Sequence, residues 1–270
     1  MTFVGTLRPR LRWHHAETEL DDFAVVSYRV ETAALAALLP AGFAPREVVF
    51  DDGRAGALVS AVAFTDRAFH FRFCPPVAIS CGQINYRAYV TAHGRTGVWF
   101  FATSLDHALV GLPRLVWGMP WRRTRIRIDA DWTSGAGRWR LIATDRSRTS
   151  ACDAAEGGAE GDTASERLDG FAGRDEWLDF LTHPTSGWYG RPDGGVGEYS
   201  IWHPPMTPRL LTARHARFPL FERLGLIDPA MAPHSVLAQP TLHFDVHTPP
   251  RRYRGRSVTD PSTIIEHRHL

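Results

Sequence analysis

The sequence predicts an α+β fold dominated by antiparallel strands, or a β-barrel-like domain. Strand-like segments follow one another in pairs around short turns, and helical segments are few and short. Strands do not alternate with helices in the way that builds a parallel sheet. With 270 residues, of which 44% are hydrophobic, the chain can bury a large core. We expect one domain over residues 1–270.

The first predicted elements are a strand and a helix. Phe23–Val30 is rich in β-branched and aromatic residues, which favour strands. Thr32–Leu39 then places its leucines on one helical face, and Pro40 with Gly42 ends the helix.

Three hairpins and one short helix follow. In the first hairpin Val48–Phe50 is expected to pair with Ala55–Phe64 around the turn Asp51–Gly53. In the second, Ile84–Ala92 pairs with Gly97–Thr103 around His93–Thr96. In the third, Arg123–Asp131 pairs with Arg138–Asp145 around Ser134–Gly137. A short helix, interrupted by Pro113, is predicted for Asp106–Val116.

The segment Thr149–Gly173 differs in character from the rest of the chain. It is rich in Ala, Gly, Ser, Asp and Glu and contains almost no large apolar residue, so we expect a mobile surface insertion. The elements predicted after it are a short helix at Asp175–Leu181, strands Gly187–Tyr189 and Gly197–Trp202 around the turn Arg191–Gly195, a helix at Arg217–Gly225, and a last strand at Thr241–His247.

The charge and hydropathy of the chain limit the classes of partner that we expect it to bind. The net charge of +2 is close to neutral, and no nucleic-acid motif accompanies the arginine clusters at residues 122–127 and 251–256. The N-terminal segment lacks the apolar core of a secretion signal, and no run of about eighteen apolar residues occurs. We expect a cytoplasmic protein that binds neither nucleic acid nor membrane, and a homo-oligomer stays open.

The last predicted strand carries three metal-compatible side chains. His243, Asp245 and His247 share one strand face, because strand side chains alternate. Neighbours two apart on a strand are spaced too widely for all three to close easily on one ion. A polar face turned to solvent or to a wet cavity is the stronger interpretation, so we expect no metal. His203, held extended by two following prolines, is either a packed histidine or a general base.

Four ordered segments carry a family resemblance. They are Asn85–Val90, Gly97–Phe101 running on to Ser104–Asp106, Trp117–Pro120, and His203–Pro205 followed by Phe221–Gly225 and the final strand. Together these segments resemble the uncharacterised YqjF-like bacterial family of the acetoacetate decarboxylase-like superfamily. The resemblance covers about Trp13 to Tyr253 and implies a mostly antiparallel, cone- or barrel-like sheet with short peripheral helices and a central pocket.

The chain lacks the group on which decarboxylation in this superfamily depends. The decarboxylases form a Schiff base on a lysine of a Gly-x-Pro-Lys-Lys segment, and the matching stretch here is Gly118–Arg122. Trp121 stands at the nucleophile position and Arg122 at its cationic neighbour, while Gln83 stands where those enzymes have a glutamate. All 31 residues counted as lysine or arginine are in fact arginine, so no lysine imine can form anywhere in the chain.

Two functions remain open at this stage. The first is a cofactor-independent enzyme that acts on a small carbonyl-bearing or polyketide-like molecule by acid/base chemistry, as an isomerase, dehydratase or cyclase. The second is a non-catalytic protein that binds or senses a small molecule in the same pocket. The candidate catalytic residues are Asp106, His203 and Arg122, and the candidate substrate-binding residues are Arg87, Gln83, Trp121, Tyr89 and His243. Arg87 could bind an anionic ligand or pair with a buried carboxylate such as Asp106.

The missing lysine gives a first prediction. Incubation with acetoacetate and borohydride should leave the mass of the protein unchanged and release no carbon dioxide, because no ε-amine is present to form the imine. Mass spectrometry of the intact protein checks this. A reduced adduct on any internal residue would overturn it.

Overall fold

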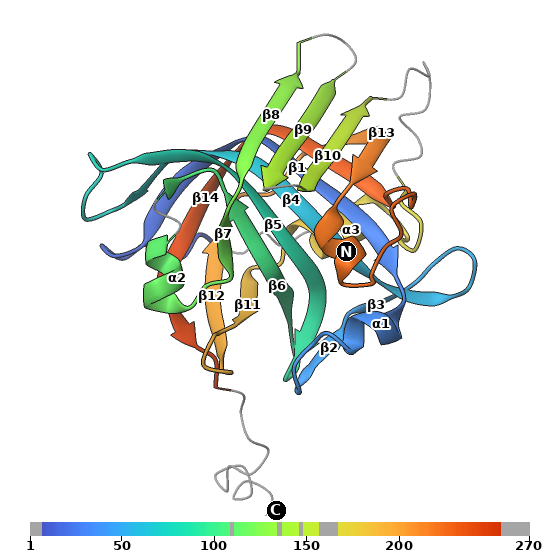
Figure 1. The fold of residues 1–270 in the computed structure, drawn as a ribbon, viewed down its shortest axis with the longest axis horizontal. Coiled ribbons are helices and arrows are strands. Elements are labelled where there is room, and N and C mark those ends of the chain that lie inside the picture. Colours follow the sequence, from blue (N-terminus) through green and yellow to red (C-terminus); the bar gives the residue numbers. More distant parts are fainter. Residues whose placement is uncertain (1–6, 109–110, 134–136, 146–147, 157–166, 255–270) are drawn as a thin grey trace, which may run out of the picture.

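The computed structural model describes residues 7–108, 111–133, 137–145, 148–156 and 167–254. Its centre is a closed barrel of seven strands (Figure 1). In spatial order they are β1 (Ala16–Val30), β4 (Ala55–Phe71), β5 (Ile79–Ala92), β6 (Arg95–Leu105), β11 (Ser186–Gly190), β12 (Val196–Trp202) and β14 (Ser235–Arg252). Neighbouring barrel strands are antiparallel except β6 and β11, which run parallel. The predicted fold class is confirmed.

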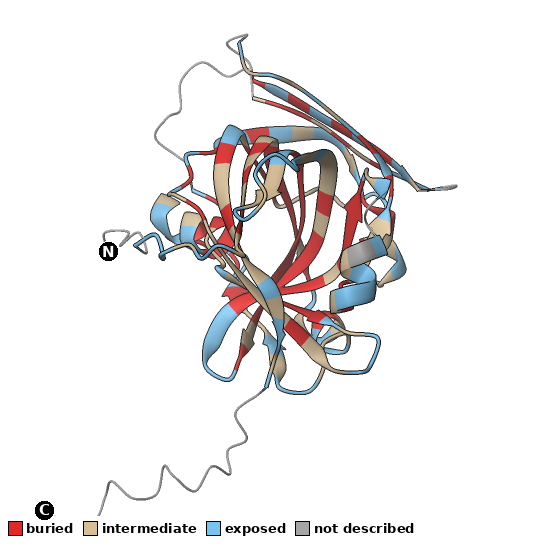
Figure 2. Cartoon of the chain, turned by 90° about the vertical axis from the view of Figure 1, so that its left-hand side faces the viewer, coloured by how far each residue is buried: buried red, intermediate tan, exposed pale blue. Residues whose placement is uncertain are grey.

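The barrel closes through β1 and β14, which come from opposite ends of the chain. Their antiparallel register extends from Ala16 opposite Val246 to Ser27 opposite Ser235. β1 also pairs with β4 along most of its length. Figure 2 looks towards the open end of the ring that these strands form.

A second sheet crosses one side of the barrel (Figures 1 and 2). It contains β13 (Arg209–Arg217), β10 (Arg148–Ala155), β9 (Arg138–Asp145) and β8 (Arg125–Asp131), and β13 also pairs with β14. Between the two layers lies an outer core with Tyr28 and Tyr86 from the barrel, Trp139 from β9, Phe221 from the helix α4 (Pro219–Arg223), and Phe218 just before that helix. The fully buried aromatic rings fix the second sheet to the barrel wall.

The remaining elements are short. They are α1 (Thr32–Ala36), β2 (Phe43–Pro45), β3 (Glu47–Val49), α2 (Gly111–Trp117), β7 (Trp121–Arg123), α3 (Arg174–Thr182) and α4 (Pro219–Arg223). α3 buries Trp177, Phe180 and Leu181 in an inner core that also contains Tyr89 of β5. Among the described residues, no helix is long and apolar enough to cross a membrane.

The hairpins predicted from the sequence are confirmed. β3 pairs with β4, β5 with β6, β8 with β9, and β11 with β12. The turn residues 134–136 of the third hairpin lie outside the described residues. The short helices near residues 32, 175 and 219 are also present, although α2 begins at Gly111 and not at Asp106, so Pro113 lies in its first turn.

The prediction of an insertion over Thr149–Gly173 is wrong at both ends. Residues 149–155 belong to β10, which pairs with both β9 and β13. Leu168 and Phe171 are buried in the inner core beside α3. The alanine- and serine-rich composition hid the strand, because small residues fit between two neighbouring strands as well as in a loop. Residues 157–166 lie outside the described part of the chain.

Close strand packing at Gly97 generates a second prediction. A Cβ atom at Gly97 would lie 2.5 Å from the Trp188 ring and 2.6 Å from the Ser186 carbonyl oxygen. Gly97→Ala should therefore lower the free energy of unfolding by about 1–3 kcal/mol, the usual effect of overpacking. Urea unfolding measures this change. Gly111→Ala, with no atom of the described residues within 4 Å of its added Cβ, is the matched control and should not lower the free energy of unfolding. Equal stability of the Gly97→Ala variant would contradict the packing described.

Candidate functional site

The barrel encloses a cavity of about 250 Å³. Its wall is mostly apolar because strand side chains alternate between the two faces of the barrel. Alternate residues of β4 and β5 point inward, and the residues between them belong to the outer core. The apolar lining includes Leu20, Phe23, Val62, Phe64, Phe69, Phe71, Ile79, Val98, Phe100, Trp117, Met119, Trp121, Ile201 and Phe244. A ligand in this cavity would be surrounded largely by hydrocarbon and aromatic surface.

Arg87 brings a positive charge into this apolar cavity. The residue is only 8% exposed. Its Nη2 atom donates to the carbonyl oxygen of Leu181 at 2.9 Å and to the hydroxyl of Tyr89 at 3.5 Å, and its Nε atom has no partner among the described residues. Within the described part of the chain, no carboxylate forms an ion pair with Arg87, although a buried cation normally needs one.

The alternative that Arg87 pairs with Asp106 is wrong. Asp106 is exposed and accepts a hydrogen bond from the backbone of Ile126 at 3.3 Å. The two side chains lie on opposite sides of the barrel wall, because Arg87 lines the cavity and Asp106 does not. The Arg87 guanidinium is therefore free to pair with an anionic group of a ligand.

Asp66 brings an acidic group to the same cavity. The residue is 8% exposed and accepts a hydrogen bond from the hydroxyl of Thr18. Burial raises the pKa of Asp66 to about 7, and the Thr18 hydrogen bond opposes this only in part. Asp66 is thus poised to gain or lose a proton near neutral pH. Beside it, burial and the nearby carboxylates Asp66 and Asp106 raise the pKa of Cys81 to about 12, which keeps the thiol protonated.

Arg87 and Asp66 stand towards opposite ends of the cavity. Asp66 lies opposite Cys81 in the β4–β5 register, and Cys81 precedes Arg87 by six residues on β5. Six residues of strand span about 20 Å between Cα atoms. Between them, Gln83 and Thr103 both donate to the side-chain oxygen of Asn85, at 3.0 and 2.9 Å. The amide hydrogens of Asn85 then remain as donors to a ligand.

The structure brings three of the predicted site residues to the cavity. Arg87, Gln83 and Trp121 line it directly. Tyr89 lies behind Arg87: its hydroxyl donates to the carbonyl oxygen of Leu181 at 3.0 Å and bonds Ser60 at 2.9 Å. Tyr89 therefore supports Arg87 and does not itself line the cavity.

Three further candidates lie away from the cavity. Arg122 points to the outer face of the wall, where its Nε atom donates to the Ser104 hydroxyl at 3.2 Å. Adjacent residues of a strand point to opposite faces, and Trp121 points inward. Asp106 is on the outside, as described above. His203 is buried behind Phe244, between the carbonyl oxygens of Pro204 and Thr182 at 2.8 and 2.9 Å.

The environment of His203 indicates a structural role for this side chain in the packed interior. Burial lowers its pKa to about 4, so the ring is neutral near pH 7. Both ring nitrogens already face carbonyl oxygens of the chain. Of the two interpretations of His203 that the sequence left open, the geometry favours the structural one.

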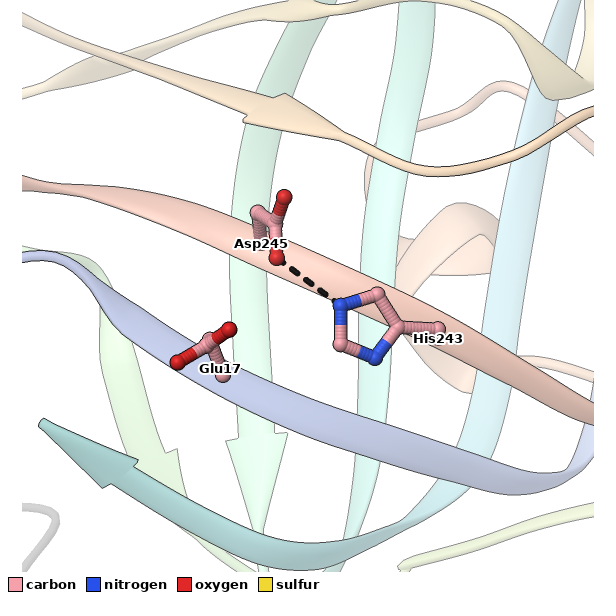
Figure 3. A group of neighbouring side chains, drawn as sticks. All are labelled: Glu17, His243 and Asp245. Carbon is pink, nitrogen blue, oxygen red and sulfur yellow. Dashed lines mark hydrogen bonds and ion pairs between the residues drawn. The ribbon is translucent and has the colours of Figure 1, made fainter. Parts of the chain in front are cut away.

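His243 belongs to a separate cluster on the outer face of β14. His243 and Asp245 from β14 lie close to Glu17 from β1 (Figure 3), and ligand atoms of the three are within 4.8 Å of one another. Arg8 closes this group: its guanidinium donates to both oxygens of Asp245 at 2.8 Å and reaches Glu17 at 3.3 Å. His247 instead bonds the Ser200 hydroxyl. Arg8 thus pairs with both carboxylates, and Arg72 pairs with Glu17 as well. The expectation that no metal binds His243, Asp245 and His247 remains a prediction.

Sequence reasoning missed Asp66. Val62, Phe64 and Asp66 are spaced by two in β4, so the parity that turns Val62 and Phe64 inward also turns Asp66 inward. Extending the predicted strand beyond Phe64 would have revealed this carboxylate. Tyr199 was also missed; it lines the cavity, stacked on Phe100 with 5.4 Å between ring centroids.

Comparisons with solved structures show which fold this is. The enduracididine biosynthesis enzyme MppR, complexed with pyruvate, has a TM-score of 0.58 and 14% identity, with 92% of this chain and 93% of that chain covered. An acetoacetate decarboxylase-like enzyme from Sphingomonas wittichii RW1 has a TM-score of 0.55 and 14% identity, over 90% of this chain and 94% of the other. Acetoacetate decarboxylase from Legionella pneumophila has a TM-score of 0.52 and 11% identity, over 94% of each chain.

The sequence comparison identifies the family. No curated protein matches the chain. The family model DUF2071, described as "Uncharacterized conserved protein (COG2071)", matches residues 17–243. This match includes all seven barrel strands, apart from the first residue of β1 and the part of β14 after His243. The chain belongs to this YqjF-like, uncharacterised family, and its fold is similar to that of acetoacetate decarboxylase.

Proposed function

We propose that the barrel binds an elongated, mostly apolar organic acid and acts on a carbonyl group of that ligand by proton transfer. The carboxylate of the ligand pairs with Arg87, its chain lies along the aromatic wall, and a carbonyl oxygen reaches Asp66. The observation that carries this proposal is the buried Arg87 guanidinium, which has no carboxylate partner among the described residues of the chain. Pyruvate, with which the similar protein MppR has been complexed, is also an acid with a carbonyl group.

Arg87 is suited to select the ligand by charge. A buried guanidinium without an anion is unfavourable, and a carboxylate can accept two parallel hydrogen bonds from it. The unpartnered Nε atom supplies one of these donors. The surrounding wall, which includes Val98, Phe100 and Tyr199, excludes water and strengthens the ion pair.

Asp66 is suited to transfer the proton. Near pH 7 both forms of Asp66 are present. The carboxylate can take a proton from the carbon beside the ligand carbonyl, and the carboxylic acid so formed can donate that proton to the carbonyl oxygen, which gives the enol. The Thr18 hydroxyl holds the carboxyl in place. Gln83, Asn85 and Trp121 line the wall between the two charged groups and orient the chain of the ligand. Isomerisation, dehydration or cyclisation of a polyketide-like acid would each begin with such an enolisation.

The binding step is tested with decanoate and decanol, which differ in the carboxylate. The wild type should bind decanoate more tightly than decanol. Arg87→Leu should reduce the ratio of the two affinities at least tenfold, since hydrogen bonds to charged groups contribute about 1.5–3 kcal/mol. Isothermal titration calorimetry measures both affinities. Arg46→Leu is the matched control, because Arg46 packs over Phe180 and does not line the cavity. If Arg87→Leu lowers the stability of the protein but leaves its preference for decanoate over decanol unchanged, the proposed binding role is contradicted.

The protonation of Asp66 gives a pH-dependent stability. Because burial raises its pKa in the folded state to about 7, the folded protein holds this proton more tightly than the unfolded chain. The resulting stabilisation is present at low pH and is lost as the pH rises towards and through about 7. Between about pH 5 and pH 8 the free energy of unfolding of the wild type should fall by about 2–3 kcal/mol relative to that of Asp66→Asn, whose side chain stays neutral. Urea unfolding at both pH values checks this, and parallel pH profiles of the two proteins would contradict it.

The catalytic step is tested by deuterium exchange into a decanoate that carries a methyl ketone at its far end. In heavy water the wild type should accelerate exchange of the hydrogens beside the ketone, and Asp66→Asn should abolish the acceleration while still binding decanoate. Nuclear magnetic resonance follows the exchange. If the wild type binds the probe without accelerating exchange, the proton-transfer role fails and the second function, a non-catalytic binding protein, takes its place.

A further inference from the structure

A second, smaller pocket lies on the other side of the barrel wall. It has a volume of about 30 Å³ and opens to solvent between the barrel, the second sheet and α4. Its polar lining comes from Tyr86 of β5, Ser104 of β6, Arg122 of β7, Thr124, Asp145 of β9, Arg148 and Ser150 of β10, and Arg223 of α4. Strand alternation separates it from the main cavity, since Arg87 and Trp121 point inward where Tyr86 and Arg122 point outward.

Three arginines converge on this pocket with too little negative charge to balance them. Among the described residues, Arg122, Arg148 and Arg223 form no ion pair. Arg122 donates only to the Ser104 hydroxyl at 3.2 Å and lies 5.4 Å from the centre of the Tyr86 ring. Of the residues that the structure describes, Asp145 is the one carboxylate that lines the pocket. Three guanidinium groups and one carboxylate give a formal local charge of +2.

The mutual repulsion of these arginines is visible in Arg223. Burial lowers its pKa, and the positive charges of Arg148 and Arg122 lower it further. Side chains of like charge usually spread into solvent when nothing holds them together. Here they remain around a single opening, an arrangement that an anion would stabilise.

The floor of the pocket offers buried hydroxyl groups. The Tyr86 hydroxyl bonds the Ser150 hydroxyl at 3.0 Å, and both side chains are buried. Thr124 is 5% exposed, and its hydroxyl has no hydrogen-bond partner among the described residues. A buried hydroxyl without a partner is unfavourable, so this group is a ready donor to a ligand oxygen.

We propose that this pocket binds a phosphate-type oxyanion. A phosphate group carries close to two negative charges at neutral pH, which matches the local charge of the pocket, and its oxygens can accept from guanidinium and hydroxyl groups together. A carboxylate would balance only half of that charge. The pocket is small and open to solvent, so a phosphate group would lie at its mouth and the rest of a phosphate ester would extend into solvent. The pocket does not depend on the function proposed for the main cavity.

The test is isothermal titration calorimetry at low ionic strength with inorganic phosphate and with phenyl phosphate, and with acetate as the monoanionic comparison. The wild type should bind at least one of the two phosphates, and bind it more tightly than acetate. Binding of phenyl phosphate alone would identify the ligand as an ester, and binding of inorganic phosphate alone as the free ion.

Variants locate the site. Arg148→Gln and Arg223→Gln, both exposed side chains, should each weaken phosphate binding at least tenfold, and the double variant should remove it. Thr124→Val should weaken binding without a change in charge. Arg214→Gln is the matched control, because Arg214 is an exposed arginine of β13 outside the pocket. The proposal is overturned if the wild type binds neither phosphate, if Arg214→Gln weakens binding as much, or if the double variant still binds.

Discussion

The antiparallel pairing of β1 with β14 is the constraint on which the structure depends. It joins strands from opposite ends of the chain and turns a long sheet into a ring. Once the ring is closed, the alternation of side chains gives every barrel strand one face towards the cavity and one face towards the outer layer. The cavity, the outer core beneath the second sheet and the arginine-lined pocket outside the barrel wall follow from this division.

Closure also determines the electrostatics of the interior. Asp66 and Arg87 are both buried in the cavity wall, so burial disfavours the charged form of each side chain. Asp66 responds by holding its proton up to a pH of about 7. Arg87 cannot release its proton in this way, because a guanidinium stays charged in proteins. The same environment thus yields a neutral acid at one end and an unbalanced cation at the other, a pair suited to hold a carboxylate and protonate a distant carbonyl.

Local signals in the sequence were sufficient for most of the fold. Turn residues and alternating apolar residues predicted the β5–β6 hairpin, and the same alternation placed Arg87 on the opposite face from Tyr86, as the structure confirms. Features fixed by distant partners were harder. β10 is a strand because it lies between β9 and β13, which its own composition does not reveal. Arg122 was placed at the cavity from its resemblance to a decarboxylase segment, but the parity of β7 turns it outward. Asp66 was not predicted as a site residue because β4 extends to Phe71, beyond the predicted strand end at Phe64.

The central claim is that Arg87 receives the carboxylate of a ligand inside the barrel. A crystal structure of the protein with decanoate tests it most directly. The account predicts the carboxylate within about 3 Å of the Arg87 guanidinium, at hydrogen-bonding distance, with the hydrocarbon chain along the aromatic wall towards Asp66. A reversed ligand with its methyl end at Arg87, or an empty cavity at saturating decanoate, would contradict it.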